Sequence, residues 1–405
     1  MKREARLQAV IELAENVWKS TACADNAVRG YMKNRRYIGG GDRKEISRIF
    51  WDMSRMLGRL RALDAELTPR KALIGYLFYT GESRESIRAA FSGGQYAPYP
   101  TEADEAAFLD SLPAALPDIS FEAPEFLRNV ISRETLEALS RPAPLDLRVN
   151  TLKTTRDDVL EILKNDGIHA EKTPYAPTGV RVLDRPDLRR HAVIENGLAD
   201  VQDEGSQLVS LLSGAQAGET VVDWCAGAGG KTLALSAMMN NRGRIDAVDY
   251  YPQRMKDLPE RVRRAGCENV RILEQYPTRP ELYDLVLLDA PCSGSGTWRR
   301  QCYLKWRTTP ESVREIAATQ AQILNNAAPF VKKGGRLVYV TCSLLAREND
   351  LQIQAFLKAH PEYVLDDLSA EFNALTGVQT DAQTVSIRPE TLGTDGFFIA
   401  RMIRK

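Results

Sequence analysis

Residues 221–232 read VVDWCAGAGGKT, and this stretch decides the fold. An apolar run of strand type leads into a loop with three glycines, and helical spacing follows the loop. Strand-like segments recur, with helical stretches between them, at 220–224, 245–249, 270–273, 285–290 and 336–340. This alternation is typical of parallel βαβ units, so we predict an α/β fold with a doubly wound sheet. Ligands of such sheets bind beyond the carboxyl ends of the strands.

The glycine loop indicates a nucleotide-like cofactor and excludes two common sites. A P-loop needs a glycine five residues before Gly230, and Cys225 stands there. The dinucleotide pattern G-x-G-x-x-G is not met either. The glycine loop of a Rossmann-like class I methyltransferase sheet is more compatible with this spacing of glycines. Asp249, at the tip of the second strand, is placed to accept hydrogen bonds from ribose hydroxyls.

Two cysteines follow the ends of the fourth and fifth strands. Cys292 lies in 289–296, DAPCSGSG, and Cys342 lies in 341–343, TCS. Because these strands are neighbours in a doubly wound sheet, we expect Asp289, Cys292 and Cys342 to converge above the cofactor. A lone cysteine after a strand is more often a small buried apolar residue. Two cysteines beside an acid, at the ends of neighbouring strands, indicate a catalytic site.

Composition narrows the class of protein. The formal net charge is zero, with six cysteines and three histidines. The cysteines are too dispersed for a disulfide framework or a zinc site, so we predict no metal. No apolar run approaches the roughly 20 residues that span a bilayer, and the charged N-terminal stretch is unlike a signal peptide. The sequence predicts a cytoplasmic protein without membrane contact, and nothing in it demands more than a monomer.

Several segments together resemble one enzyme family, the RNA cytosine-C5 methyltransferases of the Sun or Fmu type, which include the bacterial RsmB-like 16S rRNA enzymes. The segments are WCAGAGGKT (224–232), DAPCSGSGTWRR (289–300), TCSLLAREN (341–349), PLDLRVNTLK (144–153), VQDEGSQLV (201–209) and GTDGFFIARM (393–402). The pair of cysteine motifs is specific, whereas the glycine loop alone is not. The resemblance implies S-adenosylmethionine as cofactor and RNA as partner.

The resemblance also implies roles for individual residues. Cys342 would attack C6 of the cytosine, Asp289 would hold the base at N3 and N4, and Cys292 would assist product release. Lys231 would orient Asp289. DNA cytosine methyltransferases attack with the cysteine of the PC motif instead, so the TCS motif favours RNA. The implied cofactor contacts are Cys225, Ala226, Gly227, Ala228, Gly229, Gly230, Lys231, Asp249, Arg254, Glu274 and Asp289.

The sequence departs from the family after the third strand. The family usually has an acid there for the adenine amino group, whereas this chain reads LEQYP at 273–277. Glu274 or Gln275 would have to substitute. Arg254 is similar to a family arginine near the cofactor, and a solvated helix arginine is the alternative interpretation.

A basic and aromatic segment follows the first cysteine motif. Residues 298–307 read WRRQCYLKWR, and this mixture favours single-stranded RNA because cations bind phosphates and aromatic rings stack on bases. A basic helix start with core tryptophans is the alternative. The predicted RNA contacts are Arg148, Trp298, Arg299, Arg300, Trp306 and Arg307. Residues 29–61 carry ten Arg or Lys against three acids, although surface helices are commonly basic.

Spacing and resemblance divide the chain into three predicted domains. Residues 1–125 form a helical, RNA-binding (NusB-like) domain, 126–205 a small RRM-like α+β unit, and 206–405 the methyltransferase domain. In the first domain we predict helices at 5–20, 24–33, 42–63, 69–79 and 83–90. Asp42 and Glu45 are predicted to cap the third helix.

Other functions remain open at this point. A methyltransferase of small molecules or proteins would leave both cysteines and the basic segment without a role. A non-catalytic RNA-binding or ribosome-assembly factor with a degenerate pocket is the second alternative, and the missing adenine acid supports it. Among RNA substrates the sequence favours ribosomal RNA, with transfer RNA as the alternative.

Overall fold

Two folding units divide the chain, and each consists of two separate segments of the sequence. The computed structural model describes residues 1–20, 23–184 and 186–405. The first unit holds Met1–Pro142 together with Trp298–Thr308, and the second holds Ala143–Thr297 and Thr309–Lys405. The predicted boundaries at residues 125 and 205 differ from this division. The segment from Trp298 to Thr308, which we predicted in the methyltransferase domain, belongs to the helical unit.

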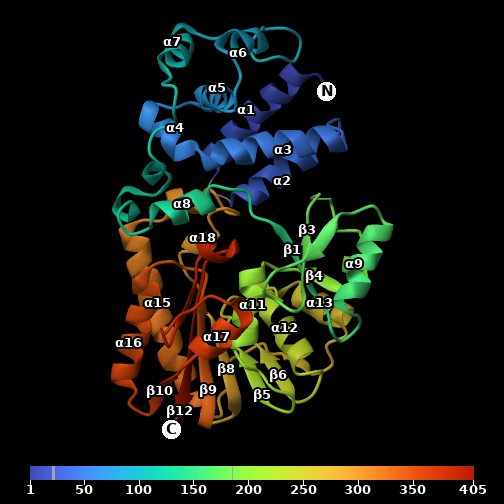
Figure 1. The fold of residues 1–405 in the computed structure, drawn as a ribbon, viewed down its shortest axis with the longest axis vertical. Helices are drawn as coiled ribbons and strands as arrows, with labels where there is room; N and C mark the ends of the chain where they lie inside the picture. The colour runs from blue at the N-terminus through green and yellow to red at the C-terminus, as the bar shows by residue number, and fades with distance from the viewer. Residues whose placement is uncertain (21–22, 185) are drawn as a thin grey trace. The chain divides into compact units, whose positions relative to one another are not determined.

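The first unit is built from short helices around one apolar core (Figure 1). Its helices are α1 (Arg3–Lys19), α2 (Ala24–Asn34), α3 (Gly40–Arg55), α4 (Leu57–Leu63), α5 (Pro69–Tyr79), α6 (Arg84–Ala90), α7 (Ala103–Ser111), α8 (Arg133–Leu139), α14 (Leu304–Arg307) and the 3-10 turns η1 (Ile119–Glu122) and η2 (Glu125–Leu127). The predicted helices are confirmed, except that 42–63 is two helices separated at Met56.

The predicted cap of the third helix is wrong. The helix begins at Gly40 with Gly39 as its N-cap, so Asp42 lies inside the first turn. The Asp42 carboxylate instead accepts from the N-terminal amine at 2.8 Å and forms an ion pair with Arg6 at 3.5 Å. The Asp42 side chain is thus engaged by groups of α1 and its start and does not cap α3.

The Trp298–Thr308 segment is anchored in the helical core. The Tyr303 hydroxyl accepts from Trp18 Nε1 at 2.9 Å and from Ser54 Oγ at 3.1 Å. The Lys305 ammonium pairs with the Glu122 carboxylate, and both side chains are almost fully buried. These contacts give the segment a structural role.

We expect Lys305→Met to destabilise the helical unit by about 1.5–3 kcal/mol, because the buried Glu122 carboxylate loses a charge-assisted hydrogen bond and keeps only Arg59, 3.6 Å away, as a paired cation. Chemical denaturation followed by tryptophan fluorescence measures the loss. Lys44→Met is the control, since Lys44 is exposed on α3 of the same unit. Equal midpoints for the two variants would contradict the importance of the buried pair.

A small antiparallel sheet begins the second unit. It contains β1 (Leu145–Val149), β2 (Ala170–Lys172), β3 (Gly179–Val182) and β4 (Ala199–Val201) in the order β2-β3-β1-β4, with α9 (Arg156–Asn165) and α10 (Ala192–Glu195). This set of strands and helices confirms the small α+β unit that the sequence predicted. The α9 N-terminus is held by a capping box between Thr155 and Asp158.

The main sheet confirms the predicted α/β architecture. Its order is β10-β12-β9-β8-β5-β6-β7, and β11 pairs with β12. The strands are β5 (Thr220–Asp223), β6 (Arg244–Ala247), β7 (Val270–Ile272), β8 (Tyr283–Asp289), β9 (Val331–Thr341), β10 (Tyr363–Asp366), β11 (Val385–Ile387) and β12 (Phe397–Arg404). Five neighbouring strands of this order, β9, β8, β5, β6 and β7, are parallel, so their carboxyl ends lie at one edge of the sheet.

Helices accompany this sheet along the chain (Figure 1). They are α11 (Glu204–Leu212), α12 (Gly230–Met238), α13 (Leu258–Ala265), α15 (Pro310–Ala327), α16 (Asp350–Ala359), α17 (Ser369–Thr376) and α18 (Pro389–Leu392). Fully buried apolar side chains such as Leu285 and Leu287 of β8 fill the space beneath them. Among the described residues, no helix combines the length and the apolar character needed to cross a membrane.

Candidate active site

The glycine loop joins the end of β5 to α12 in a conformation that glycine permits. Gly227 and Gly229 have φ angles of 49° and 83°. A Cβ on Gly229 would lie 2.1 Å from Leu258 Cδ1, so a side chain there would collide with α13. The positive φ and the close approach together require glycine. The loop backbone is therefore held against the carboxyl edge of the sheet.

Asp249 ties the glycine loop to the second strand. Its buried carboxylate accepts from Gly227 N and from Tyr251 N, each at 2.9 Å. Arg254 forms an ion pair with it at 3.1 Å. A carboxylate has about four acceptor positions, so these donors leave capacity for a ligand hydroxyl. Asp249 lies beside the glycine loop as the sequence predicted, whereas Arg254, for which two interpretations were open, pairs with Asp249 and stays exposed.

The region after β7 lacks a buried acid. Glu274 and Gln275 are both exposed. The ring of Tyr276 instead lies against that of Trp224, with centroids 4.7 Å apart and the planes tilted by 36°, and its hydroxyl donates to Trp224 O at 3.3 Å. An aromatic pair therefore lies after β7, where the sequence analysis expected Glu274 or Gln275 to take the place of an acid.

Lys231 and Asp289 form the central ion pair of the site. Lys231 Nζ lies 2.7 Å from Asp289 Oδ2, with the lysine nearly buried and the aspartate partly exposed. Burial acts to lower the pKa of Lys231, but the charge and hydrogen bond of Asp289 outweigh it and raise the pKa. Lys231 is therefore a buried cation held against a carboxylate that keeps one face exposed.

The two cysteines converge as the strand order predicted. Residues Asp289 and Val340 are paired in the register of β8 and β9, so the loops after these strands begin side by side. Cys292 Sγ and Cys342 Sγ lie 3.3 Å apart, and both residues are partly exposed. The hydrogen bond to Cys342, burial and nearby negative charge raise the pKa of Cys292. Cys292 is thus a thiol near neutral pH.

A buried acid at the base of the loop escaped the sequence analysis. Asp223 ends β5, and its Oδ2 accepts from Thr232 Oγ1 at 2.7 Å. Its Oδ1 is buried and has no hydrogen-bond partner among the described residues. Burial raises the pKa of Asp223 to about 7, against the opposing effect of Thr232. An unsatisfied carboxylate oxygen under a glycine loop indicates that a polar ligand group completes the site.

Three of the predicted RNA contacts are buried. Trp298 and Arg299 are nearly inaccessible within the helical unit. Arg148 lies between the small sheet and the main sheet, where Nε donates to Gln202 Oε1 at 2.7 Å and the guanidinium pairs with Asp200 at 3.4 Å. These side chains offer no surface for RNA in this structure. Arg307 is exposed, while Arg300 and Trp306 are partly exposed, so these three stay predictions.

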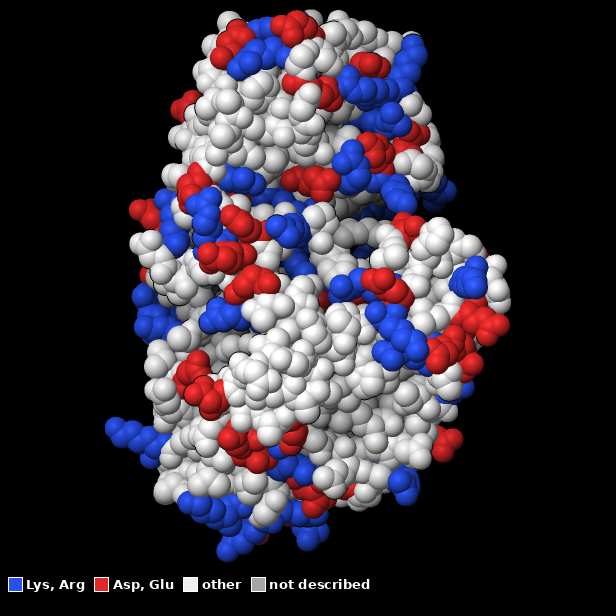
Figure 2. All heavy atoms as spheres, viewed as in Figure 1, with Lys and Arg blue, Asp and Glu red and all other residues white. Residues whose placement is uncertain are grey.

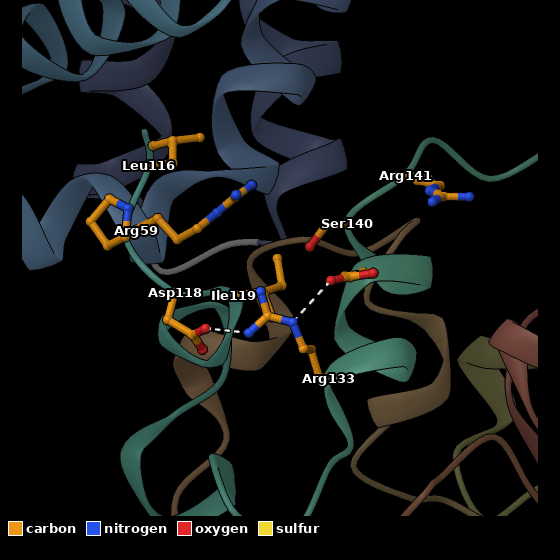
Figure 3. A pocket seen from close by; sticks show the side chains of 9 residues that line it. Arg59, Leu116, Asp118, Ile119, Arg133, Ser140 and Arg141 are labelled. Carbon is orange, nitrogen blue, oxygen red and sulfur yellow. Dashed lines mark hydrogen bonds and ion pairs between the residues drawn. The ribbon is translucent and has the colours of Figure 1, made fainter. Parts of the chain in front are cut away.

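A cavity of about 600 Å³ lies in the helical unit (Figure 3). Its walls include Arg59, Arg133 and Arg141, and Arg133 is paired with Asp118 and Glu137 in the same wall. The sequence analysis did not single out this cavity. None of its lining residues belongs to the cysteine, lysine and aspartate set, so the cavity is separate from the chemistry of the sheet edge.

A glycine loop, an acid at the second strand tip and reactive side chains at the parallel strand ends define the protein as a Rossmann-like methyltransferase. Comparison with known proteins narrows this class. Residues 210–403 match the family model of the 16S rRNA methyltransferase RsmB/F, and residues 132–189 match the ferredoxin-like domain of RsmF/B-like methyltransferases. These two matches group the chain with the RsmB/F methyltransferases.

Individual relatives agree with the family models. The chain is 36% identical over 273 residues to a probable ribosomal RNA small subunit methyltransferase B of Bacillus subtilis, covering 65% of this chain and 60% of the relative. It is 33% identical over 310 residues to ribosomal RNA small subunit methyltransferase F of Serratia proteamaculans, covering 73% and 62%. The chain thus spans about three fifths of the length of these relatives.

A solved structure resembles the whole chain. The crystal structure of PH0851 superposes with a TM-score of 0.81 at 26% identity, covering 100% of this chain and 99% of that one. The helical unit, the small sheet and the main sheet therefore recur together in another protein.

Proposed function

We propose that this protein transfers a methyl group from S-adenosylmethionine to carbon 5 of a cytosine in RNA, through a covalent bond between Cys342 and C6 of the base. The observation that carries the proposal is the pair of sulfur atoms 3.3 Å apart beside the Lys231–Asp289 ion pair. In other methyltransferase reactions, two adjacent thiols would have no role. The names of the relatives support ribosomal RNA as the substrate.

The residues of the glycine loop fit S-adenosylmethionine. Asp249 would accept from the ribose hydroxyls with its remaining capacity. The unsatisfied Oδ1 of Asp223 would receive hydrogen bonds from the methionine ammonium, directly or through water, and this cation would favour the ionised form of Asp223. When bound, S-adenosylmethionine supplies an electrophilic methyl group on a sulfonium. The aromatic pair of Trp224 and Tyr276 would provide the apolar wall for the adenine.

Cys342 and Asp289 would make the cytosine reactive. Carbon 5 is a poor nucleophile until C6 receives an electron pair, and a thiolate is suited to give one because sulfur attacks readily and leaves again. Cys342 would bond to C6 while Asp289 holds the base through N3 and the exocyclic N4. Lys231 would keep Asp289 in this orientation. Electron density gathered on the ring then makes C5 the methyl acceptor.

Cys292 would act in the last step. After C5 is methylated, its proton passes to water and the C5–H electron pair restores the C5–C6 double bond. The bond between C6 and Cys342 breaks, and its electrons return to the Cys342 sulfur. The Cys292 thiol lies within hydrogen-bond distance of that sulfur and would stabilise it as it leaves.

Exposed cations of the helical unit offer a surface for RNA. Basic and acidic side chains alternate over much of this unit (Figure 2). Arg48, for example, is paired with Glu45 and Asp52. Arg29, Lys33 and Arg36 are exposed, and within the described part of the chain they form no ion pair. Unpaired surface cations release counterions on binding phosphates, so these three support an RNA contact.

We expect replacement of Arg29, Lys33 and Arg36 by alanine to weaken RNA binding and to reduce the slope of log K against log salt by roughly 2 to 3. Filter binding of ribosomal RNA fragments over a salt series measures this slope. Arg48→Ala is the control, because Arg48 is already neutralised by two acids. An unchanged slope in the triple variant would place the RNA contacts elsewhere.

Methylation assays test the proposed function. Purified protein is incubated with labelled S-adenosylmethionine and small-subunit rRNA, transfer RNA or protein, and 5-methylcytosine is mapped by bisulfite sequencing. We expect label in ribosomal RNA. Label in transfer RNA alone would change the substrate class. Cofactor binding measured by calorimetry, without methylation of any RNA, would favour a non-catalytic RNA-binding factor.

A further inference from the structure

We propose that Glu348 is a positioning residue that joins the two cysteine-bearing loops and holds Cys292 as a hydrogen-bond donor to the sulfur of Cys342. The inference rests on the proposed covalent function and assigns a role to a residue that touches neither cofactor nor base. Glu348 ends the 3-10 turn η6 (Ala346–Glu348) that follows Cys342, and it is fully buried.

One carboxylate connects both loops. Glu348 Oε1 accepts from Ser293 N at 2.8 Å and from Gln320 Nε2 at 3.3 Å. Glu348 Oε2 accepts from Ser293 Oγ at 2.5 Å and from Ser343 Oγ. Ser293 directly follows Cys292, and Ser343 directly follows Cys342. The two serine hydroxyls also lie 3.2 Å apart, so Glu348 and this direct contact together set the separation of the two loops and of their sulfur atoms.

The hydrogen bonds also indicate the charge on Glu348. All four partners donate, which suits a carboxylate because a protonated acid would need an acceptor for its own hydrogen. Within the described part of the chain Glu348 forms no ion pair. An unpaired charge is costly to bury, and a buried carboxylate retained beside two reactive thiols is better explained by its effect on them than by stability.

That effect falls on Cys292. The titratable groups around its thiol are Cys342, Glu348 and Tyr339 of β9, whose hydroxyl donates to Glu348 O at 2.7 Å. The hydrogen bond to Cys342, burial, and the charges of Cys342 and Glu348 all raise the pKa of Cys292. Lys231 interacts with Cys342, whose charge contributes to the raised pKa of Lys231. These interactions thus keep the proton on Cys292.

Glu348→Gln tests the proposal, because it removes the charge and keeps the shape. The first readout is the pH dependence of iodoacetamide alkylation at Cys292, resolved by peptide mass spectrometry on the full chain without RNA. We expect the midpoint to fall by about one unit, which corresponds to about tenfold faster alkylation of Cys292 at pH 7.5. Glu315→Gln is the control, since Glu315 is exposed on α15.

The second readout separates attack from release. In Glu348→Gln we expect a denaturation-resistant RNA adduct to accumulate and turnover to fall by about 10²-fold, while the rate of adduct formation changes by less than about threefold. A purely structural role would slow adduct formation and turnover together and would leave the Cys292 midpoint unchanged. The proposal would be overturned if Glu348→Gln slowed adduct formation and turnover together. It would also be overturned if the variant kept wild-type turnover and the wild-type alkylation midpoint of Cys292.

Two provisions keep the test decisive. If Glu348→Gln fails to fold, Glu348→Asp retains the charge and shortens the reach, and we expect slow release with a Cys292 midpoint near that of wild type. Two results for Glu348→Asp would contradict the role of side-chain length. One is a Cys292 alkylation midpoint lowered by about one unit, as expected for loss of the charge, and the other is release of the RNA at the wild-type rate. If the wild-type protein methylates no RNA, the proposed function fails, and the alkylation readout alone then decides whether Glu348 controls Cys292.

Discussion

Cys342→Ala is expected to lower methylation of RNA by about 10⁴-fold or more, because it removes the atom that attacks C6. Without that bond, C5 of the cytosine stays too poor a nucleophile to accept the methyl group. Binding of S-adenosylmethionine should change little, since Cys342 lies on the loop after β9 and most of the proposed cofactor contacts lie in the loops after β5 and β6. Filter assays of labelled methyl transfer and calorimetry with the cofactor measure the two quantities.

Cys267→Ala provides the matched control for this loss. Cys267 is buried among apolar residues after α13, so its replacement removes a thiol without removing the proposed nucleophile. Its activity should stay near that of the wild-type protein. Residual methylation of more than about one per cent in Cys342→Ala would be incompatible with an obligatory bond between Cys342 and the base.

Asp289→Asn is expected to reduce turnover by about 10² to 10⁴-fold. The amide keeps the size of the side chain but loses the charge that holds the base at N3 and N4, so the electron-rich adduct is less stable. Lys231 would lose its ionic partner and with it the orienting role. Steady-state kinetics at saturating cofactor measure the loss, which should appear mainly in kcat.

The Lys231→Met and Asp289→Asn double variant tests the link between the two residues. If Lys231 acts through Asp289, the double variant should be no slower than Asp289→Asn alone, because coupled residues are not additive. Multiplicative losses would show that Lys231 acts independently, for example on the cofactor. Thermal unfolding of all three variants identifies any loss that comes from instability.

Most of the main sheet and the meeting of its reactive residues could be predicted, because both follow from local patterns. Apolar runs separated by helical spacing gave five strands, and their parallel order brings Asp289, Cys292 and Cys342 to one edge. Asp249 could be placed for the same reason, since it ends the strand next to the glycine loop. The distance between the sulfur atoms needed the structure, as it depends on loops whose shape the sequence pattern leaves open.

Other positions could not be predicted, because long-range packing decides them. Arg148 alternates with apolar residues on its strand as a surface residue would, yet in the interior Asp200 pairs with its charge and Gln202 accepts a hydrogen bond from it. The basic segment after Cys292 looks suited to RNA, but Glu122 and Trp18, far away in sequence, fix its Lys305 and Tyr303 in the helical unit. Glu348 lies within the segment TCSLLAREN (341–349), and only its contacts with Ser293 and Ser343 indicate its role.

Trapping of an RNA adduct in Cys292→Ala tests the covalent account most directly. The variant is incubated with S-adenosylmethionine and ribosomal RNA, separated under denaturing conditions and digested, and the modified peptide is sequenced by mass spectrometry. Cys342→Ala is run beside it. The account predicts a stable adduct in Cys292→Ala alone, with the nucleotide attached to Cys342. An adduct that forms in Cys342→Ala and maps to Cys292 would contradict the account and make Cys292 the nucleophile.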